Sequence, residues 1–324
     1  MQSISANEST LNHLNCDLCG SNSSFEHALK IDAFSIYRCL KCQTSRIVPI
    51  PTSAELDAVY SSEYYTSIPA PVVKGLSYKT RMVTTKAHWM ESSTSPIKLA
   101  AFWRLATLFF KNRVIPVRLK HDAKILDLGC GNGARLRELA DYGFTNLYGV
   151  ETNSLAVVAA RDSTEAIIFN GELHSAAFPA DTFDLVIMNQ VLEHVPSPTE
   201  TLSEVKRILK SNGAVYITVP NFGSIEAGYF GAFWSGLRIP EHLHHFEPKT
   251  LIGFLTKLDF KMSFVATNSI PALTEESYIS KLVAAGGKFI KGISRFRRIP
   301  IKLITLPFDM LGRGQLIRVV ATKK

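Results

Sequence analysis

The sequence lacks an apolar run long enough to cross a membrane. Its most apolar stretch, residues 99–110, is too short to span a bilayer and is interrupted by Arg104. Residues 1–15 are polar, without the basic start and apolar centre of a secretory peptide, and we expect them to form a flexible tail. These two absences argue against a membrane-spanning or secreted protein and predict a cytoplasmic one.

Cysteine is also scarce, with five residues in 324. Because cytoplasmic thiols stay reduced, disulfides are not expected. Four of the five form the pairs "CDLC" (Cys16, Cys19) and "CLKC" (Cys39, Cys42). Two such pairs present four thiolates to a tetrahedral Zn²⁺ and leave no open position, so we predict a structural zinc module over residues 16–48. Two redox-active C-x-x-C motifs are the alternative interpretation.

Acidic residues are nearly missing from one window of the chain. Residues 281–313 contain eight basic residues and one acid, Asp309, so this window carries +7 of the net charge of +8. The apolar and basic residues of its middle part fall on different faces of a helix, which is the pattern of a helix lying in a lipid headgroup region. We predict that the basic amphipathic insert 270–313 contacts the inner face of the cytoplasmic membrane through residues 288–306. An amphipathic helix packed on the sheet is the alternative.

Residues 49–119 are rich in Pro, Ser, Thr and Tyr before a stretch with helical apolar spacing, and we expect a helical connector or cap there. The next segment, residues 123–133, reads "AKILDLGCGNG" and is followed by the helical pattern "ARLRELADYG". A strand, a glycine turn and a helix form the opening unit of a doubly wound α/β sheet. Gly129, Gly131 and Gly133 let the backbone approach a ligand closely.

The next strand, in "NLYGVETN", ends in Glu151, where an acid accepts hydrogen bonds from the two hydroxyls of a ribose. The site is therefore predicted to bind a nucleoside. The glycines alone also fit a dinucleotide-binding loop, which leaves a dehydrogenase as an alternative. Asp127, two residues before Gly129, favours an ammonium group over a pyrophosphate.

Four segments together resemble the class I S-adenosylmethionine-dependent methyltransferases over roughly residues 120–270: "ILDLGCGNG", Glu151, "FDLVIMNQVLEHV" and "LKSNGAVYITVPN". Within that family, "NGELHSAAFPADTFD", "ITVPNFGS" and "FWSGLRIPEHLHHFEPKTL" are similar to a bacterial subgroup. Its members often carry an N-terminal four-cysteine zinc module and modify sugars or glycan-linked groups. The resemblance implies a seven-stranded Rossmann-like sheet within residues 120–324, and S-adenosylmethionine as the cofactor.

The resemblance also implies roles for individual residues. Asp127 and the glycine turn would cradle the methionine part of the cofactor, and Glu151 would bind the ribose. Leu173, with Glu172 or His174, would flank the adenine, although many relatives carry Asp at that place. The full implied cofactor-binding set is Asp127, Gly129, Cys130, Gly131, Gly133, Glu151, Thr152, Glu172, Leu173 and Asn189.

Three histidines stand close together in "IPEHLHHFEP", residues 239–248. The fifth strand ends near Asn221 and the next helix starts near Pro248, so residues 221–248 are expected to form an active-site insert over the cofactor's methyl group. A histidine there is suited to act as a general base. His242 and His245 match the H-x-x-H-F part of the subgroup's pattern P-H-x-x-H-F, and His194 in "LEHV" is expected to assist from the other side of the cleft. A purely structural role and a metal site are the alternatives.

We therefore expect methyl transfer to a sugar hydroxyl or carbon of a nucleotide-sugar or a lipid-linked glycan. The alternative is a zinc-ribbon nucleic-acid-binding protein or an RNA methyltransferase. A module that grips phosphates should be visibly positive. The stretch from Cys16 to Cys42 carries three basic residues against three acidic ones. Nucleic acid is therefore disfavoured as a partner.

Overall fold

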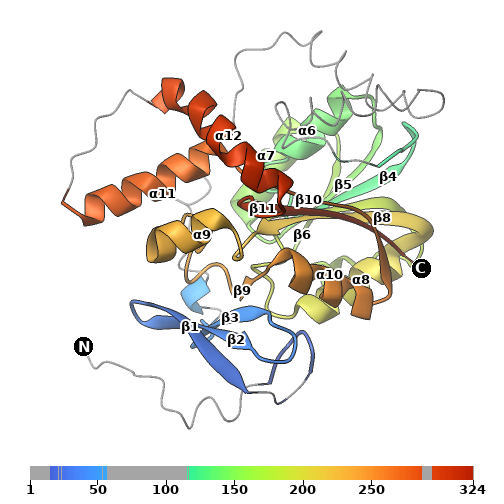
Figure 1. Cartoon of the computed structure of the whole chain (residues 1–324). Helices are drawn as coiled ribbons and strands as arrows, with labels where there is room; N and C mark the ends of the chain where they lie inside the picture. The colour runs from blue at the N-terminus through green and yellow to red at the C-terminus, as the bar shows by residue number, and fades with distance from the viewer. Residues whose placement is uncertain are drawn as a thin grey trace, which may run out of the picture.

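The computed structural model describes residues 15–20, 22, 24–52, 54–56, 115, 117–286 and 294–323, with the backbone alone for residues 294–300 and 302. These residues form a large sheet with helices on both faces and a smaller sheet at one side (Figure 1). Most of the expected connector, residues 49–119, lies outside the described residues.

The larger sheet has seven strands in the described chain, in the order β6-β5-β4-β7-β8-β11-β10. The first five strands of this order are parallel, and β11 runs antiparallel to both of its neighbours. This confirms the predicted doubly wound, Rossmann-like α/β sheet. The strands are β4 (Lys124–Leu128), β5 (Asn146–Glu151), β6 (Ile167–Asn170), β7 (Phe183–Asn189), β8 (Leu209–Pro220), β10 (Phe260–Asn268) and β11 (Leu316–Lys323).

Alternate residues of the central strands face opposite sides of this sheet. In β7, Leu185 and Ile187 belong to one core, whereas Val186 and Met188 belong to the other. All four are fully buried, as expected for parallel strands covered on both faces. One face is covered by α6 (Ala134–Asp141) and α7 (Ser154–Ser163), and the other by α8 (Pro198–Ile208) and α10 (Pro248–Lys257).

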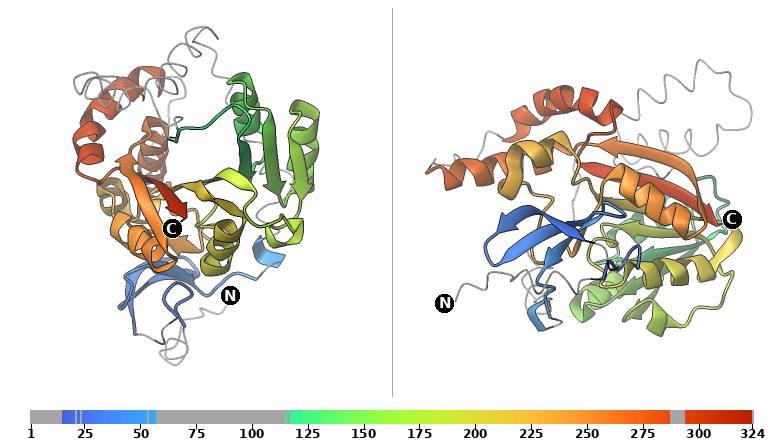
Figure 2. Two further views of the ribbon diagram at one scale, coloured as in Figure 1. Left: turned by 90° about the vertical axis from the view of Figure 1, so that its right-hand side faces the viewer. Right: turned by 60° about the horizontal axis from the view of Figure 1, so that its bottom comes forward.

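The smaller sheet joins two segments that are far apart in the sequence. The cysteine module supplies β1 (Phe25–Ile31), β2 (Phe34–Cys39) and β3 (Ser45–Val48), which pair antiparallel in that order. Its fourth strand is β9 (His244–His245), which belongs to the predicted active-site insert. Ser45 pairs with His245, and Arg46 pairs with His244. The cysteine module and the insert therefore share one sheet, and both views of Figure 2 show this module beside the main fold.

The remaining elements surround the edge where the parallel strands end. The insert contains α9 (Ile225–Phe230) and the 3-10 turn η2 (Gly231–Phe233). Two further helices, α11 (Pro271–Ala284) and α12 (Ser294–Met310), follow β10 in the chain. In the described part of the chain, no helix is both long enough and apolar enough to span a bilayer. The expected membrane surface at residues 288–306 lies largely outside the described side chains.

Candidate active site

The four cysteines of the two C-x-x-C pairs lie together. The Sγ atoms of Cys16 and Cys42 are 3.5 Å apart, and those of Cys19 and Cys39 are 3.8 Å apart. All four sulfurs lie within 4.8 Å of one another. Zinc–sulfur bonds of about 2.3 Å in a tetrahedron place the sulfurs about 3.8 Å apart, so the cluster fits a single Zn²⁺ with four thiolate ligands.

The glycine turn after β4 needs glycine for two reasons. Gly129, Gly131 and Gly133 have φ angles of 69°, 52° and 76°, in the left-handed region that favours glycine. A Cβ on Gly129 would lie 2.7 Å from a methyl carbon of Val191, whereas one on Gly131 would meet nothing within 4 Å. The space in front of Gly131 is thus open to a ligand. The Sγ of Cys130 packs toward Gly149 in the core.

Two buried carboxylates stand at the ends of β4 and β5. Glu151 accepts hydrogen bonds from the backbone N–H of Gly131 (2.9 Å) and of Asn153 (2.9 Å), so it holds the glycine turn in place. Burial raises the pKa of Asp127 to about 7; the Arg135 guanidinium opposes this shift and the Glu151 carboxylate adds to it. A buried acid with so little compensation favours a bound cation such as an ammonium group.

The other predicted cofactor residues follow the ends of neighbouring parallel strands. Thr152 follows β5, and Glu172 and Leu173 follow β6, with Glu172 exposed and Leu173 buried. Asn189 ends β7, and its Oδ1 accepts a hydrogen bond from the Thr218 hydroxyl (2.8 Å). The structure therefore brings the whole predicted set to one edge of the sheet, the edge at which this architecture binds ligands. Together with the open glycine turn, the acids fit the amino group and ribose of S-adenosylmethionine.

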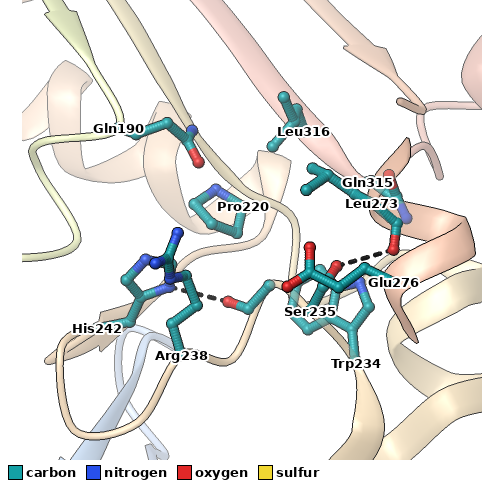
Figure 3. Close-up of a pocket in the computed structure, with 11 residues that line it drawn as sticks. Gln190, Pro220, Trp234, Ser235, Arg238, His242, Leu273, Glu276, Gln315 and Leu316 are labelled. Carbon is teal, nitrogen blue, oxygen red and sulfur yellow. Dashed lines mark hydrogen bonds between the residues drawn. The ribbon is translucent and has the colours of Figure 1, made fainter. Parts of the chain in front are cut away.

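A pocket opens on the same edge and includes Gln190, the residue after Asn189 (Figure 3). Gln190 follows the parallel strand β7 and Pro220 ends β8, while Gln315 and Leu316 stand at the start of the antiparallel strand β11. Helix α11 contributes Leu273 and Glu276 to the opposite wall. The insert closes the pocket with Trp234, Ser235, Gly236, Arg238 and His242.

Two of the predicted histidines meet at this pocket. The rings of His194 and His242 contact edge to face, with centroids 4.6 Å apart. The Nδ1 of His242 lies 2.9 Å from the Gly236 carbonyl, and the Nδ1 of His194 lies 3.1 Å from the Glu241 carbonyl. A carbonyl oxygen only accepts, so each Nδ1 donates and each neutral ring keeps its lone pair on Nε2. Burial lowers the pKa of His194 to about 4 and that of His242 well below its usual value.

Glu193 completes this cluster, and the sequence reasoning did not single it out. Its side chain is fully buried, and neither carboxylate oxygen has a hydrogen-bond partner among the described residues. Burial raises its pKa to about 8. One ligand atom each from Glu193, His194 and His242 lies within 4.8 Å of the other two. The available signal was the adjacency of Glu and His in "LEHV", directly after the fourth strand.

The other two histidines of the insert lie behind the pocket. His244 and His245 form β9, and both are buried. The His245 ring packs on Phe222, with centroids 5.2 Å apart, and lies 6.5 Å from the His242 ring. Neither His244 nor His245 lines the pocket. Of the histidines considered as bases, the structure brings His194 and His242 together, whereas His245 does not line the pocket.

The strand order, the glycine turn and the acids at the carboxyl edge define a class I S-adenosylmethionine-dependent methyltransferase. Residues 101–263 match the family described as a methyltransferase domain, and the chain belongs to this family.

Individual relatives match parts of the chain. A ubiquinone biosynthesis O-methyltransferase of Glaesserella parasuis serovar 5 (strain SH0165) is 26% identical over 176 residues, covering 49% of this chain and 73% of that protein. The sterol 24-C-methyltransferase erg-4 of Neurospora crassa is 30% identical over 104 residues, covering 30% of this chain and only 27% of its own length. Among solved structures, a SAM-dependent methyltransferase from Archaeoglobus fulgidus has 20% sequence identity and a TM-score of 0.44, covering 74% of this chain and 99% of that one.

Proposed function

We propose that the chain transfers the methyl group of S-adenosylmethionine to a hydroxyl or carbon of a small polar acceptor, a sugar of a nucleotide-sugar or of a lipid-linked glycan. The observation that carries this proposal is the pocket of Figure 3, which adjoins the cofactor edge. Its wall combines an indole with amide, carboxylate and guanidinium groups. The indole Nε1 of Trp234 is buried without a hydrogen-bond partner among the described residues, so it can donate to an acceptor oxygen.

The names of the relatives are in line with a hydroxyl or a carbon as the acceptor atom, but they do not point to a sugar. One is a 24-C-methyltransferase and the other an O-methyltransferase, so carbon and oxygen acceptors both occur among similar chains. Neither name refers to a sugar. Gln190, Glu276 and Gln315 place amide and carboxylate groups in the wall of this pocket, and these groups can bind the hydroxyls of a polyhydroxylated acceptor.

The chain's own contribution to the reaction is alignment. S-adenosylmethionine, when bound, supplies a methyl group already activated on a sulfonium. Asp127 would hold its amino group and Glu151 its ribose hydroxyls, while the glycine turn lets the backbone approach. Holding the acceptor in line with the methyl group can remove about 7–11 kcal/mol of the barrier at best.

The acceptor's proton leaves at the cluster of Glu193, His194 and His242. His242 is the histidine of this cluster that lines the pocket, and the Nε2 lone pair of the neutral ring is the group that promotes proton loss. His194 contacts it from the loop after β7. His245 would act only through His242, since it does not line the pocket.

The proposal extends to the cysteine cluster, which we assign to a structural Zn²⁺. The support is the mutual spacing of the four Sγ atoms, which matches a tetrahedral site with no open position. Zinc would also supply folding free energy to a small module that has little core of its own.

The test of the methyl transfer is direct. Purified protein is incubated with S-adenosylmethionine and a panel of nucleotide-sugars, and the products are analysed by mass spectrometry. We expect one sugar nucleotide to gain the mass of one methylene group, while the cofactor is converted to S-adenosylhomocysteine in equal amount. A panel that stays unmodified, together with methylation of a phenolic or sterol acceptor, would contradict the sugar assignment.

A further inference from the structure

The side-chain cluster of Glu193, His194 and His242 brings together three groups that can each offer a lone pair. Both oxygens of Glu193 are buried without a hydrogen-bond partner in the described part of the chain. The two imidazoles beside it direct their N–H groups elsewhere, to the carbonyls of Gly236 and Glu241. Their remaining nitrogens, the Nε2 atoms, carry lone pairs and cannot donate to the carboxylate.

Burying a carboxylate is costly, and burial raises the pKa of Glu193 although the charge of Arg238 lowers it. Arg238 is paired with Glu241, with Nε and Oε2 3.4 Å apart, and its side chain is 44% exposed. Three potential ligand atoms within 4.8 Å of one another are spaced to share one positive centre.

We propose that Glu193, His194 and His242 bind one divalent first-row transition ion, such as Mn²⁺, Fe²⁺, Co²⁺ or Zn²⁺, which in turn binds the acceptor hydroxyl. Two imidazoles and one carboxylate suit these ions better than Mg²⁺ or Ca²⁺, which prefer oxygen ligands throughout. Three protein ligands leave coordination positions open, as in catalytic metal sites. His242 lines the pocket, so those positions are accessible from the acceptor's side.

Hydrogen bonds to neighbouring residues orient the two histidine side chains in the way that is typical of metal ligands. Histidines that bind a metal almost always donate their second N–H to a carbonyl or carboxylate, and both do so here. The backbone carbonyl of Glu193 accepts hydrogen bonds from the N–H groups of Leu243 (2.8 Å) and His244 (3.1 Å). The insert, which carries His242, thereby also holds the backbone of Glu193.

The ion deepens the proposed function, on which this inference rests. A hydroxyl bound to a divalent ion has a lowered pKa, so its O–H bond breaks and the proton passes to water in the pocket. The resulting alkoxide oxygen forms a bond to the methyl carbon, and the carbon–sulfur bond breaks with its electron pair staying on sulfur. The products are a methyl ether and the neutral thioether S-adenosylhomocysteine, and the ion keeps its oxidation state. In this step the lone pair of His242 binds the ion, and the ion in turn lowers the pKa of the acceptor hydroxyl.

The binding test uses full-length protein whose zinc content is first brought to one per chain. Mn²⁺ is added, and free Mn²⁺ is followed by electron paramagnetic resonance. We expect one Mn²⁺ to bind per chain in addition to the zinc. Glu193→Gln keeps the side chain's size but removes a charged ligand oxygen, and we expect Mn²⁺ affinity to fall at least ~10-fold. Glu241→Gln removes a neighbouring acid outside the cluster and should change the affinity less than about threefold. Thermal melts of both variants check that they fold.

The outcomes separate the ion from the methyl transfer. Wild-type protein that binds no Mn²⁺, or equal weakening by Glu193→Gln and Glu241→Gln, would overturn the metal site. Methyl transfer that continues unchanged after a chelator has removed the second ion, with zinc still at one per chain, would overturn its role and leave the proposed function standing. Mn²⁺ binding that depends on Glu193, in a chain that methylates no hydroxyl acceptor, would refute the proposed function and leave the site standing.

Discussion

His242→Ala is expected to lower the turnover of methyl transfer at least ~10²-fold while leaving the affinity for S-adenosylmethionine unchanged. The substitution removes the ring that lines the acceptor pocket and whose Nδ1 is held by the Gly236 carbonyl. Asp127 and Glu151, the proposed cofactor residues, come from strands β4 and β5 and not from the insert that carries this ring. Turnover measured at saturating acceptor, with calorimetry of cofactor binding, separates the two effects.

A matched control is His27→Ala, which removes an exposed histidine from β1 of the cysteine module. It should turn over like the wild type. If His242→Ala also turned over normally, the insert would be scaffolding, and the group that promotes proton loss would lie elsewhere.

Cys39→Ser should abolish zinc binding and lower turnover at least ~10²-fold. A structural zinc site loses much of its binding free energy when one ligand is removed. Cys39 ends β2, and the adjoining strand β3 is the only strand paired with β9 in the described structure. A further link is the ion pair of Arg38 with Glu247, 2.8 Å between Nη2 and Oε1. Loss of the module therefore releases the segment that carries the active-site histidines.

Zinc content by elemental analysis, turnover and cofactor affinity are measured on the same preparation. Cys130→Ser is the control for zinc, because Cys130 lies in the core of the main domain and outside the cluster. It should retain one zinc per chain. Full activity in zinc-free Cys39→Ser protein would show that the insert holds its shape without the module.

The sheet and the cofactor edge could be predicted because local patterns encode them. "AKILDL" before three glycines, and "NLYGVE" ending in an acid, each specify a buried parallel strand and the loop that follows it. The structure places β4, β5 and the turn between them as those patterns predicted. Pro248 likewise stands in the first turn of α10.

The pairing of β9 with β3 could not be predicted in the same way. A strand of two residues has no periodicity, and its partner lies some 200 positions earlier in the chain. Glu193 was missed for a related reason. A charged residue in a loop is usually solvated, and its burial follows only from the insert folding over it. The separation of His242 from His245 depends on that same pairing.

Two of the predictions from the sequence that stay predictions concern partners of the protein. The membrane contact of residues 288–306 concerns side chains that lie largely outside the described residues. The disfavoured role in nucleic-acid binding rests on the charge of the module, where Arg38 and Arg46 are engaged in ion pairs with Glu247 and Asp17. Such pairing is consistent with a module that stabilises the insert.

The central claim, that the acids at the carboxyl edge hold S-adenosylmethionine, is tested most directly by calorimetry of cofactor binding across the pH range. At about pH 8, Asp127→Ala and Glu151→Ala should each weaken binding at least ~10-fold, with unchanged thermal melts as the check on folding. In the wild type, the pKa of Asp127 is raised to about 7, so its carboxyl is neutral below that pH and must lose a proton to bind the amino group. Affinity should therefore fall roughly tenfold for each pH unit below about 7, and Asp127→Ala should lose this dependence. Unchanged affinity in both variants, with no loss of wild-type binding toward low pH, would contradict the account.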